Sequence, residues 1–268
     1  MIVLIIILVL IMYLYLIMPR VFHRPDYSKF KTCNFAHRGI HNNKGNIPEN
    51  SKKAFQRAIE LGYGIELDVQ LTKDNKVVVF HDFNLERMCG VKKEICELTF
   101  EELQQYSLLN TNQKIPLFSD VLHEVQGKVP LLVELKCRNM KDQVAPKTDS
   151  ILSDYQGVYY IQSFHPIALM WYRKNRPDII RGQLAEIYEL QKELHSNLVY
   201  FLQQHLIFNV LCRPDFISYN WKDQKEWSLN LCKYLFKSPI AAWTVRSKKE
   251  LEKCKNKFNV IIFEKFYL

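Results

Sequence analysis

Short apolar runs alternate with amphipathic stretches along most of the 268-residue chain. The apolar runs have the length and β-branched content of buried strands. They occupy residues 33–37, 65–71, 130–136, 158–164, 179–186, 215–221, 240–245 and 259–264. The stretches with helical spacing cover residues 51–62, 118–127, 166–176, 187–211, 225–236 and 247–255. The pattern therefore predicts strands that alternate with helices.

Alternation of this kind is typical of parallel strands joined by helical crossovers. Eight such strands within residues 32–268 match the size of a (β/α)8 TIM barrel, an α/β fold. A doubly wound parallel sheet is the alternative, but no Gly-x-Gly-x-x-Gly motif follows the first strand. We therefore expect residues 32–268 to form one TIM barrel.

The segment "IELDVQLTKDNKVVVFHD" (65–82) interrupts this alternation. Its second apolar run, residues 77–79, follows the second strand after a turn too short for a parallel crossover. An antiparallel hairpin is therefore predicted, which would bring His81 back to the carboxyl end of the second strand. Barrel active sites lie at that end. Residues 83–115 are expected to form a small insertion over the same end.

The amino end contains no charged side chain from Met1 to Met18, a length able to cross a bilayer. A buried core helix is the alternative, but it would show a polar face, and this segment has only Tyr13 and Tyr15. The basic start and small-residue cleavage site of a signal peptide are missing from the sequence. We expect a transmembrane helix over 1–18 and a polar linker over 19–31.

Basic residues follow the apolar segment, and no basic side chain precedes it; they are Arg20, Arg24, Lys29 and Lys31. The positive-inside rule then predicts a single-pass protein of the cell membrane with its barrel on the cytoplasmic side. The seven cysteines agree with a reducing compartment, because they are odd in number and lack paired spacing.

The formal net charge of +9 is interpreted as attraction to anionic membrane lipid. A solvated basic surface without a specific partner is the alternative. Nucleic acid is not an expected partner, because the lysines are scattered and form no basic run with interleaved aromatic residues.

Three acidic residues lie at strand positions where a soluble core would be apolar. Glu66 and Asp68 share one face of the second strand, and Glu134 lies on the third. Buried carboxylates are costly unless they are paired or hold an ion. Three hard oxygen donors at one barrel end would suit Mg²⁺ or Ca²⁺ rather than zinc. Simple ion pairing with basic neighbours is the alternative for any one of them.

Basic and imidazole groups accompany these acids. Arg38 follows the first strand and Lys136 ends the third, so both could bind a phosphate beside the metal. His37 and His81 could serve as a general base and a general acid. A turn cap for His81 and a buried, satisfied ring for His37 are the structural alternatives.

The motifs "AHRG", "PENS", "IELDVQLTKDNKVVVFHD", "IPLFSDVL", "LLVELK", "IQSF" and "AAWTV" resemble the glycerophosphodiester phosphodiesterase family, from about residue 35 to residue 245. The resemblance implies a TIM barrel that hydrolyses glycerophosphodiesters to an alcohol and glycerol 3-phosphate. It implies metal ligands at Glu66, Asp68 and Glu134. His37 and His81 would then be the acid–base pair, and Arg38 and Lys136 would bind the phosphate.

Several points stay open in this resemblance. Glu49 is expected either to cap the first barrel helix or, like Asp82, to lie just outside the metal ligands. Phe164 and Trp243 would form either an apolar wall for substrate or part of the core. The family usually ends on a strand with Thr-Asp, whereas this chain has Glu264. A lysophospholipase D-like activity on membrane lysolipids and a non-catalytic binding barrel are alternative functions.

The stretch 187–211 is longer and more apolar than a crossover helix requires. It is expected either to dip into the bilayer beside the amino-terminal helix or to pack on the barrel as a helix or helix pair.

Overall fold

The strands of this protein form one sheet that closes on itself. In the computed structural model, which describes residues 1–188 and 194–268, eight strands run parallel and a ninth pairs antiparallel. The strands are β1 (Asn34–His37), β2 (Gly64–Leu71), β3 (Val77–Val79), β4 (Leu131–Leu135), β5 (Tyr159–Ser163), β6 (Arg181–Ala185), β7 (Phe216–Asn220), β8 (Ile240–Val245) and β9 (Val260–Phe263). β1 pairs with both β2 and β9, which closes the ring.

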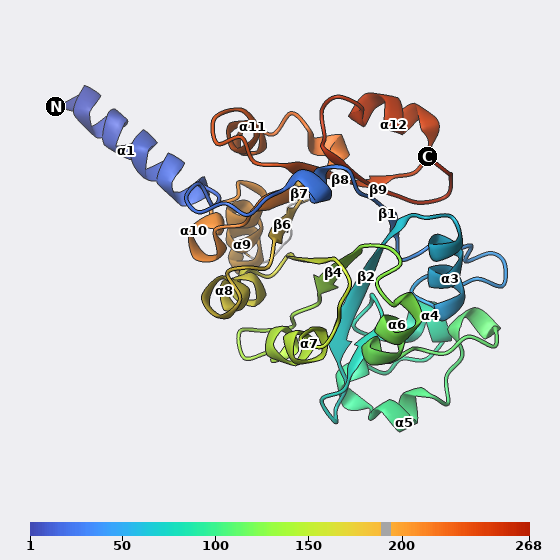
Figure 1. Ribbon diagram of the computed structural model, residues 1–268. Helices are drawn as coiled ribbons and strands as arrows, with labels where there is room; N and C mark the ends of the chain where they lie inside the picture. The colour runs from blue at the N-terminus through green and yellow to red at the C-terminus, as the bar shows by residue number, and fades with distance from the viewer. Residues whose placement is uncertain (189–193) are drawn as a thin grey trace.

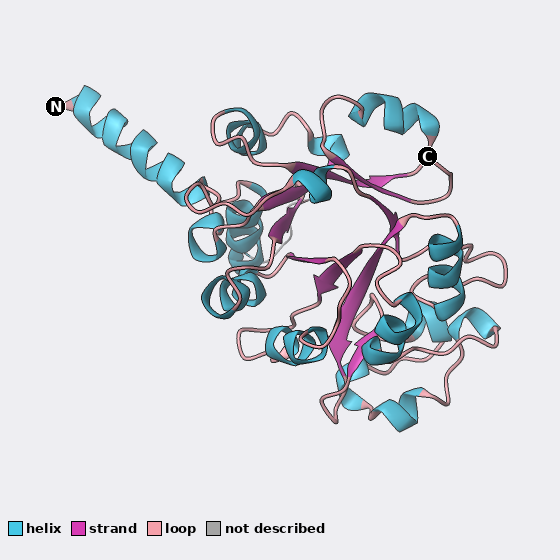
Figure 2. Ribbon diagram, in the orientation of Figure 1, coloured by secondary structure: helices cyan, strands magenta, loops and turns pink. Residues whose placement is uncertain are grey.

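Helices surround the ring of strands, as Figure 2 shows. They are α1 (Ile2–Ile17), α2 (Ser28–Lys31), α3 (Lys52–Glu60), α4 (Glu86–Cys89), α5 (Phe100–Leu103), α6 (Phe118–Val125), α7 (Val144–Leu152), α8 (Pro166–Asn175), α9 (Leu194–Gln204), α10 (Asn209–Cys212), α11 (Trp227–Tyr234) and α12 (Lys248–Cys254). Short 3₁₀ turns lie at Ile95–Glu97, Leu108–Asn110 and Trp221–Asp223.

The prediction of a TIM barrel is confirmed. Each of the eight predicted strand segments coincides with one of the parallel strands found in the described part of the chain to within two residues at either end. The doubly wound alternative is wrong, because an open sheet would leave two edges, whereas β1 bonds to a strand on each side.

The barrel interior is apolar at one end and polar at the other. Phe35 of β1, Tyr160 of β5 and Phe216 of β7 form an aromatic cluster with Phe30 of α2. Because side chains repeat their direction every second residue, the residues two positions later on these strands lie above that cluster. This places His37 and its polar neighbours at the carboxyl ends of the strands, where barrel sites form.

The hairpin and the insertion predicted after the second strand are also present. β3 returns antiparallel to β2, with Val79 opposite Val69. Residues 80–117 follow and have their own small core, which includes Phe80, Leu85 and Ile95. The insertion is therefore a packed element that can hold side chains in fixed positions over the site.

The prediction of a transmembrane helix over 1–18 is not supported. Across residues 1–188 and 194–268, no helix combines the length and apolar character needed to cross a membrane. The helix there, α1, has 16 residues and ends at Ile17, because Pro19 forces the preceding Met18 into an extended conformation with ψ of 122°. Figure 1 shows α1 leaving the barrel beside α10 and extending away from it.

The segment expected as a linker includes α2, whose Phe30 is fully buried. The helical run predicted over 187–211 consists, in its described part, of α9 and α10; residues 189–193 of that run lie outside the described residues. Leu206 and Cys212 are buried against the barrel, as expected for a helix pair that packs on it.

Candidate active site

Strand register brings the predicted acidic residues together. His37 of β1 lies opposite Glu66 of β2, and Asp68 of β2 lies opposite Glu134 of β4. Because these three strands are neighbours and run parallel, their carboxyl ends meet at one point of the barrel rim. The residues predicted from three separate motifs thus share one location.

The three carboxylates converge closely enough to share one ion. Glu66, Asp68 and Glu134 are 2%, 1% and 6% exposed, and ligand oxygens of all three lie within 4.8 Å of one another. Asn50 donates a hydrogen bond of 2.8 Å to Asp68, and Gln162 donates one of 3.2 Å to Glu66. These amides orient the carboxylates toward the centre of the site.

Two cations lie beside the carboxylates. The Lys136 Nζ atom is 2.5 Å from an oxygen of Glu134 and 3.1 Å from an oxygen of Asp68. The Arg38 Nε atom is 3.4 Å from Asp68, and its Nη1 donates to Glu49 at 2.6 Å. Both cations are therefore fixed at positions where they could bind oxygens of an anionic substrate.

The donor set fits a hard divalent cation. Burial and the nearby charges of Asp68 and Glu134 raise the pKa of Glu66 well above its usual value, and burial also raises the pKa of Glu134. Lys136 and Arg38 compensate only part of this negative charge, since Arg38 is also paired with Glu49. Glu66, Asp68 and Glu134 would hold Mg²⁺ or Ca²⁺, ions that prefer carboxylate oxygens.

The His-Arg-Gly sequence forms the tight turn that ends β1. Arg38 has a φ of 57° and Gly39 a φ of 79°. A Cβ atom on Gly39 would lie 2.8 Å from the backbone carbon of Ala54. Only glycine fits this close approach at positive φ. The turn also directs the Arg38 amide to Glu66, to which it donates a hydrogen bond of 3.1 Å.

His81 lines the site, and a carboxylate holds its ring through Nδ1. Its Nδ1 atom is 2.6 Å from Oδ1 of Asp82. Asp82 in turn accepts hydrogen bonds of 2.6 and 3.1 Å from Arg87 of α4. The hairpin therefore supplies both the histidine and its carboxylate partner, and the insertion fixes that carboxylate.

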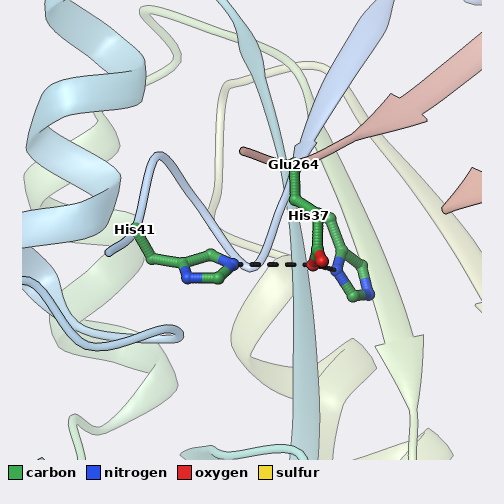
Figure 3. A group of neighbouring side chains, drawn as sticks. All are labelled: His37, His41 and Glu264. Atoms are coloured by element: carbon green, nitrogen blue, oxygen red, sulfur yellow. Dashed lines mark hydrogen bonds and ion pairs between the residues drawn. The ribbon is translucent and has the colours of Figure 1, made fainter. Parts of the chain in front are cut away.

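His37 is also held by a carboxylate, which comes from the last strand segment of the barrel. Its Nδ1 atom lies 2.8 Å from Oε2 of Glu264, as Figure 3 shows. Burial, with the added effect of Arg38, lowers the pKa of His37 to about 4 against the opposing hydrogen bond to Glu264. The ring is thus neutral at neutral pH, and a proton on Nδ1 would leave Nε2 as an acceptor.

Glu264 has further partners. Arg246 donates to it at 2.6 Å, and the Nε2 atom of His41 lies 3.7 Å away. Burial alone would raise the pKa of Glu264, but His37, His41 and Arg246 together lower it. His37, His41 and Glu264 also offer ligand atoms within 4.8 Å of one another. The close pairing with Arg246 favours a hydrogen-bonding role over a second metal site.

Glu49 does not cap the first helix, one of its two predicted roles. Ser51 is the N-cap of α3 and accepts a hydrogen bond from the Ala54 amide. Glu49 instead pairs with Arg38 and with Arg87, whose two hydrogen bonds to it measure 2.7 and 3.0 Å. It therefore links Arg38 to the insertion that supports His81.

A small cavity of about 50 Å³ lies between the histidines and the acids. It is lined by His37, Arg38, Glu66, His81, Glu134, Lys136, Gln162, Phe164, Leu184, Trp243 and Ile262. Phe164 and Trp243 pack edge to face with ring centroids 5.5 Å apart. These two aromatic residues thus form one wall of the cavity, as one of the two sequence expectations proposed.

Sequence reasoning missed several residues that complete the site. Arg87, Asn50 and Gln162 each contact a predicted site residue. His41 contacts Glu264, and neither of these two was predicted as a site residue. Two of the missed residues could have been found from the sequence motifs, because Asn50 belongs to "PENS" and Gln162 to "IQSF". Arg87 lies on the short helix α4 of the insertion and His41 in the loop after β1, and only the folded chain brings them to the site.

Comparison with protein families agrees with this geometry. A family described as the glycerophosphoryl diester phosphodiesterase family matches residues 37–203. The chain belongs to this family. The match begins at His37 and includes His81, Glu134 and Lys136.

Curated relatives carry related names. A glycerophosphodiester phosphodiesterase of Bacillus altitudinis is 33% identical over 157 residues, which cover 54% of this chain and 63% of that protein. Lysophospholipase D GDPD1 of Rattus norvegicus is 30% identical over 151 residues, covering 52% of this chain and 46% of the relative. The chain thus spans between about half and two thirds of these relatives.

Solved structures share the fold. A glycerophosphodiester phosphodiesterase from Thermotoga maritima has a TM-score of 0.64 and 24% identity, with 86% of this chain and 94% of that chain covered. An Oleispira antarctica phosphodiesterase, solved with the product sn-glycerol-3-phosphate, has a TM-score of 0.68 and 20% identity, with 88% and 94% covered. These likenesses agree with the closed barrel described above.

Proposed function

We propose that this protein hydrolyses glycerophosphodiesters to an alcohol and glycerol 3-phosphate with the help of a divalent metal ion. The main support is that His37 and His81, each oriented by a carboxylate, line the same cavity as Glu66 and Glu134. Two proton-transfer groups beside an oxygen-rich cation site are what metal-assisted cleavage of a phosphodiester needs. The curated relatives support the same activity.

Substrate binding begins with the phosphate. Arg38 and Lys136 line the cavity and point fixed positive charges into it. They would hold the two non-bridging oxygens, and they would also stabilise the negative charge that develops there in the transition state. Phe164 and Trp243 would pack against the carbon atoms of the glycerol.

His37 is suited to be the base. Because it is neutral and Glu264 accepts its Nδ1 proton, Nε2 would take the proton from a glycerol hydroxyl next to the phosphate. That hydroxyl attacks phosphorus while His81, held by Asp82, donates a proton to the departing alcohol. Water then opens the cyclic phosphate with the two histidines in reversed roles, which gives glycerol phosphate.

A metal ion bound by Glu66, Asp68 and Glu134 would supply charge neutralisation at the phosphate and would orient the attacking hydroxyl. The arrangement of the three carboxylates favours binding of such an ion, because a bound cation would relieve their mutual repulsion.

The activity is tested with the full-length protein in detergent and glycerophosphocholine as substrate. We expect release of glycerol phosphate that EDTA abolishes and that Mg²⁺ or Ca²⁺ restores. His37→Ala and His81→Ala should each lower kcat by about 100-fold or more, since each removes a proton-transfer group. His123→Ala is the matched control, because His123 is exposed on α6. Full activity of His37→Ala and His81→Ala would contradict the proposal and favour a non-catalytic binding barrel.

Lysophospholipids are a second candidate substrate class. The similarity to lysophospholipase D GDPD1 of Rattus norvegicus supports it. Such substrates keep the free glycerol hydroxyl and the phosphodiester on which the same chemistry depends, and they add one acyl chain.

We further propose that α1 attaches the protein to membrane lipid at the cytoplasmic face of the cell membrane. Its side chains from Met1 to Met12 are all exposed, and it carries no charge. An exposed apolar helix of this length is strongly unfavourable in water and favourable in the acyl region of a lipid layer. The net charge of +9 would add attraction to anionic lipid.

Co-sedimentation with vesicles tests this attachment. The double variant Ile6→Lys and Leu10→Lys places two charges on the exposed helix and should lower vesicle binding by about tenfold or more. Leu61→Lys, also exposed but on the barrel, serves as the control. Equal binding of both variants would exclude α1 as the contact with lipid.

A further inference from the structure

An apolar groove of about 560 Å³ runs from the barrel rim along the outer helices. Its walls come from the insertion, from the ends of β4 and β5, and from α8, α9 and α10. The side chains that give it an apolar surface include Phe83, Met140, Phe164, Ile167, Phe208 and Leu211. The volume is within the range of about 300–1,000 Å³ that is usual for ligand pockets.

The groove continues directly from the proposed active site. Glu134, Lys136 and Phe164 line both the groove and the cavity that holds the two histidines. A substrate whose phosphate lies at Lys136 therefore has the groove beside it. Any long group attached to the glycerol can lie there without leaving the site.

The groove favours an apolar occupant. Gln203, a polar residue in its wall, donates its side-chain hydrogen bond of 2.8 Å to the carbonyl of Phe164. His165, another one, accepts the Ile167 amide at 3.3 Å. The Gln203 amide nitrogen and the His165 Nδ1 atom are thus engaged by the protein, and the surface of the groove is mostly carbon.

We propose that this groove binds the acyl chain of a single-chain lysophospholipid, so that such diesters are the preferred substrates. The inference rests on the phosphodiesterase function proposed above. In the net reaction, the P–O bond to the head-group alcohol breaks and a water hydroxyl bonds to phosphorus. The remaining water proton goes to the alcohol, and an acylglycerol phosphate stays in the groove until release.

Side-chain contacts hold the outer wall of the groove in place. The Arg138 guanidinium lies 4.6 Å from the Phe83 ring centroid and donates to the Phe83 carbonyl at 2.9 Å. Arg138 is itself held by Glu94 at 2.6 Å. Phe83 therefore keeps an exposed aromatic ring in place over the groove, an arrangement that is costly in water and useful against an acyl chain.

One helix that lines the groove, α10, also contacts α1. Leu211 at the groove belongs to α10, and the same short helix holds the end of α1. Asn209 donates to the Ile17 carbonyl at 2.7 Å, and Arg213 donates to the carbonyls of Tyr15 and Met18. Figure 1 shows α1 beside α10. A lysophospholipid in a membrane contacted by α1 would thus be close to the groove.

Chain-length dependence tests the inference. The full-length protein is assayed on lysophosphatidylcholines with hexanoyl and decanoyl chains, both kept as monomers, and on glycerophosphocholine. A fully buried methylene increases affinity about fourfold. For an open groove we expect about half of that free energy, which is about twofold per methylene. The four additional methylenes should then raise kcat/KM about fifteenfold from hexanoyl to decanoyl. The double variant Met140→Glu and Leu211→Glu should bring this ratio close to one.

Leu61→Glu is the matched control and should keep the wild-type ratio, because Leu61 is an exposed leucine outside the groove. Binding of hexanoyl and decanoyl glycerol phosphate, measured by calorimetry, gives the same comparison without turnover. Melting temperatures verify that the variants are folded.

Equal kcat/KM values and equal affinities for both chain lengths would overturn the acyl-chain inference, even if glycerophosphocholine is hydrolysed. Absence of turnover on every diester would instead reject the phosphodiesterase function, and the calorimetry would still decide the groove. Concentration-dependent dimers that dissociate in the Met140→Glu and Leu211→Glu variant would show that a second copy fills the groove, which also overturns the inference.

Discussion

The Nδ1 atom of His37 lies 2.8 Å from Oε2 of Glu264, although the two residues are 227 positions apart in the chain. The contact exists because β1 and β9 are neighbours in the closed barrel. It orients the imidazole and determines which ring nitrogen faces the cavity.

Replacing Glu264 with Gln tests this contact. Since Glu264 opposes the burial that lowers the pKa of His37 to about 4, loss of its charge should lower that pKa further. The acidic limb of the kcat/KM profile should then move to lower pH, and kcat should fall by about tenfold or more, because the base is weaker and less well oriented.

Glu252→Gln, on the exposed face of α12, is the control for this pH profile. A Glu264→Gln profile that superimposes on the wild-type profile, with kcat unchanged, would mean that the hydrogen bond has no part in the reaction.

Because the three carboxylates repel one another, removing the charge of Glu66 should stabilise the metal-free protein and weaken the binding of a metal ion. Because the pKa of Glu66 is raised in the fold, its ionised form destabilises the metal-free protein, and stability should fall as pH rises above about 4.5. In EDTA at pH 7.5, Glu66→Gln should therefore raise the melting temperature by about 2–4 °C.

With Mg²⁺ or Ca²⁺ added, the order should reverse, since the wild-type protein gains stability from a bound ion and the variant loses a ligand. Differential scanning calorimetry in both conditions provides the measurement. A lower melting temperature of the variant in EDTA would show that Glu66 is compensated without a metal ion.

Arg87 is expected to act on catalysis through His81. It donates hydrogen bonds to both Asp82 and Glu49, and it lies in the insertion. Arg87→Ala should lower kcat by about tenfold while KM changes little, because Asp82 would no longer be held against the His81 ring.

Lys92→Ala is the control for that variant, since Lys92 belongs to the same insertion and its ion pair with Glu86 is exposed. Steady-state kinetics on glycerophosphocholine separate the two parameters. An unchanged kcat together with a raised KM would assign Arg87 to substrate binding instead.

Phe30 is expected to be part of the barrel core and not of a flexible linker. It is fully buried against Phe35, Tyr160 and Phe216. Phe30→Ala should lower the free energy of unfolding by about 3–5 kcal/mol, as is usual for a buried phenylalanine. Phe22→Ala, in the same segment but exposed, should change it by less than about 0.5 kcal/mol. Urea denaturation of both variants compares the two, and equal stabilities would contradict a role for Phe30 in the core.

Much of the fold could be predicted from local patterns in the sequence. The eight strand segments, the hairpin after β2 and the grouping of Glu66, Asp68 and Glu134 follow from period-two patterns and from parallel strands ending at one rim. The end of α1 was also readable from Pro19, because a proline restricts the residue before it. The apolar run predicted a helix over 1–18, and the structure has one over Ile2–Ile17.

The partners of the site residues were decided by tertiary structure. Glu264 reaches His37 only when the sheet closes, and Arg87 reaches Glu49 only when the insertion folds over the barrel mouth. The apolar groove likewise combines residues from the insertion with residues of α8 and α10. A sequence pattern records which face of its own strand or helix a side chain occupies. Which side chains meet depends on how distant elements pack, and that depends on the whole chain.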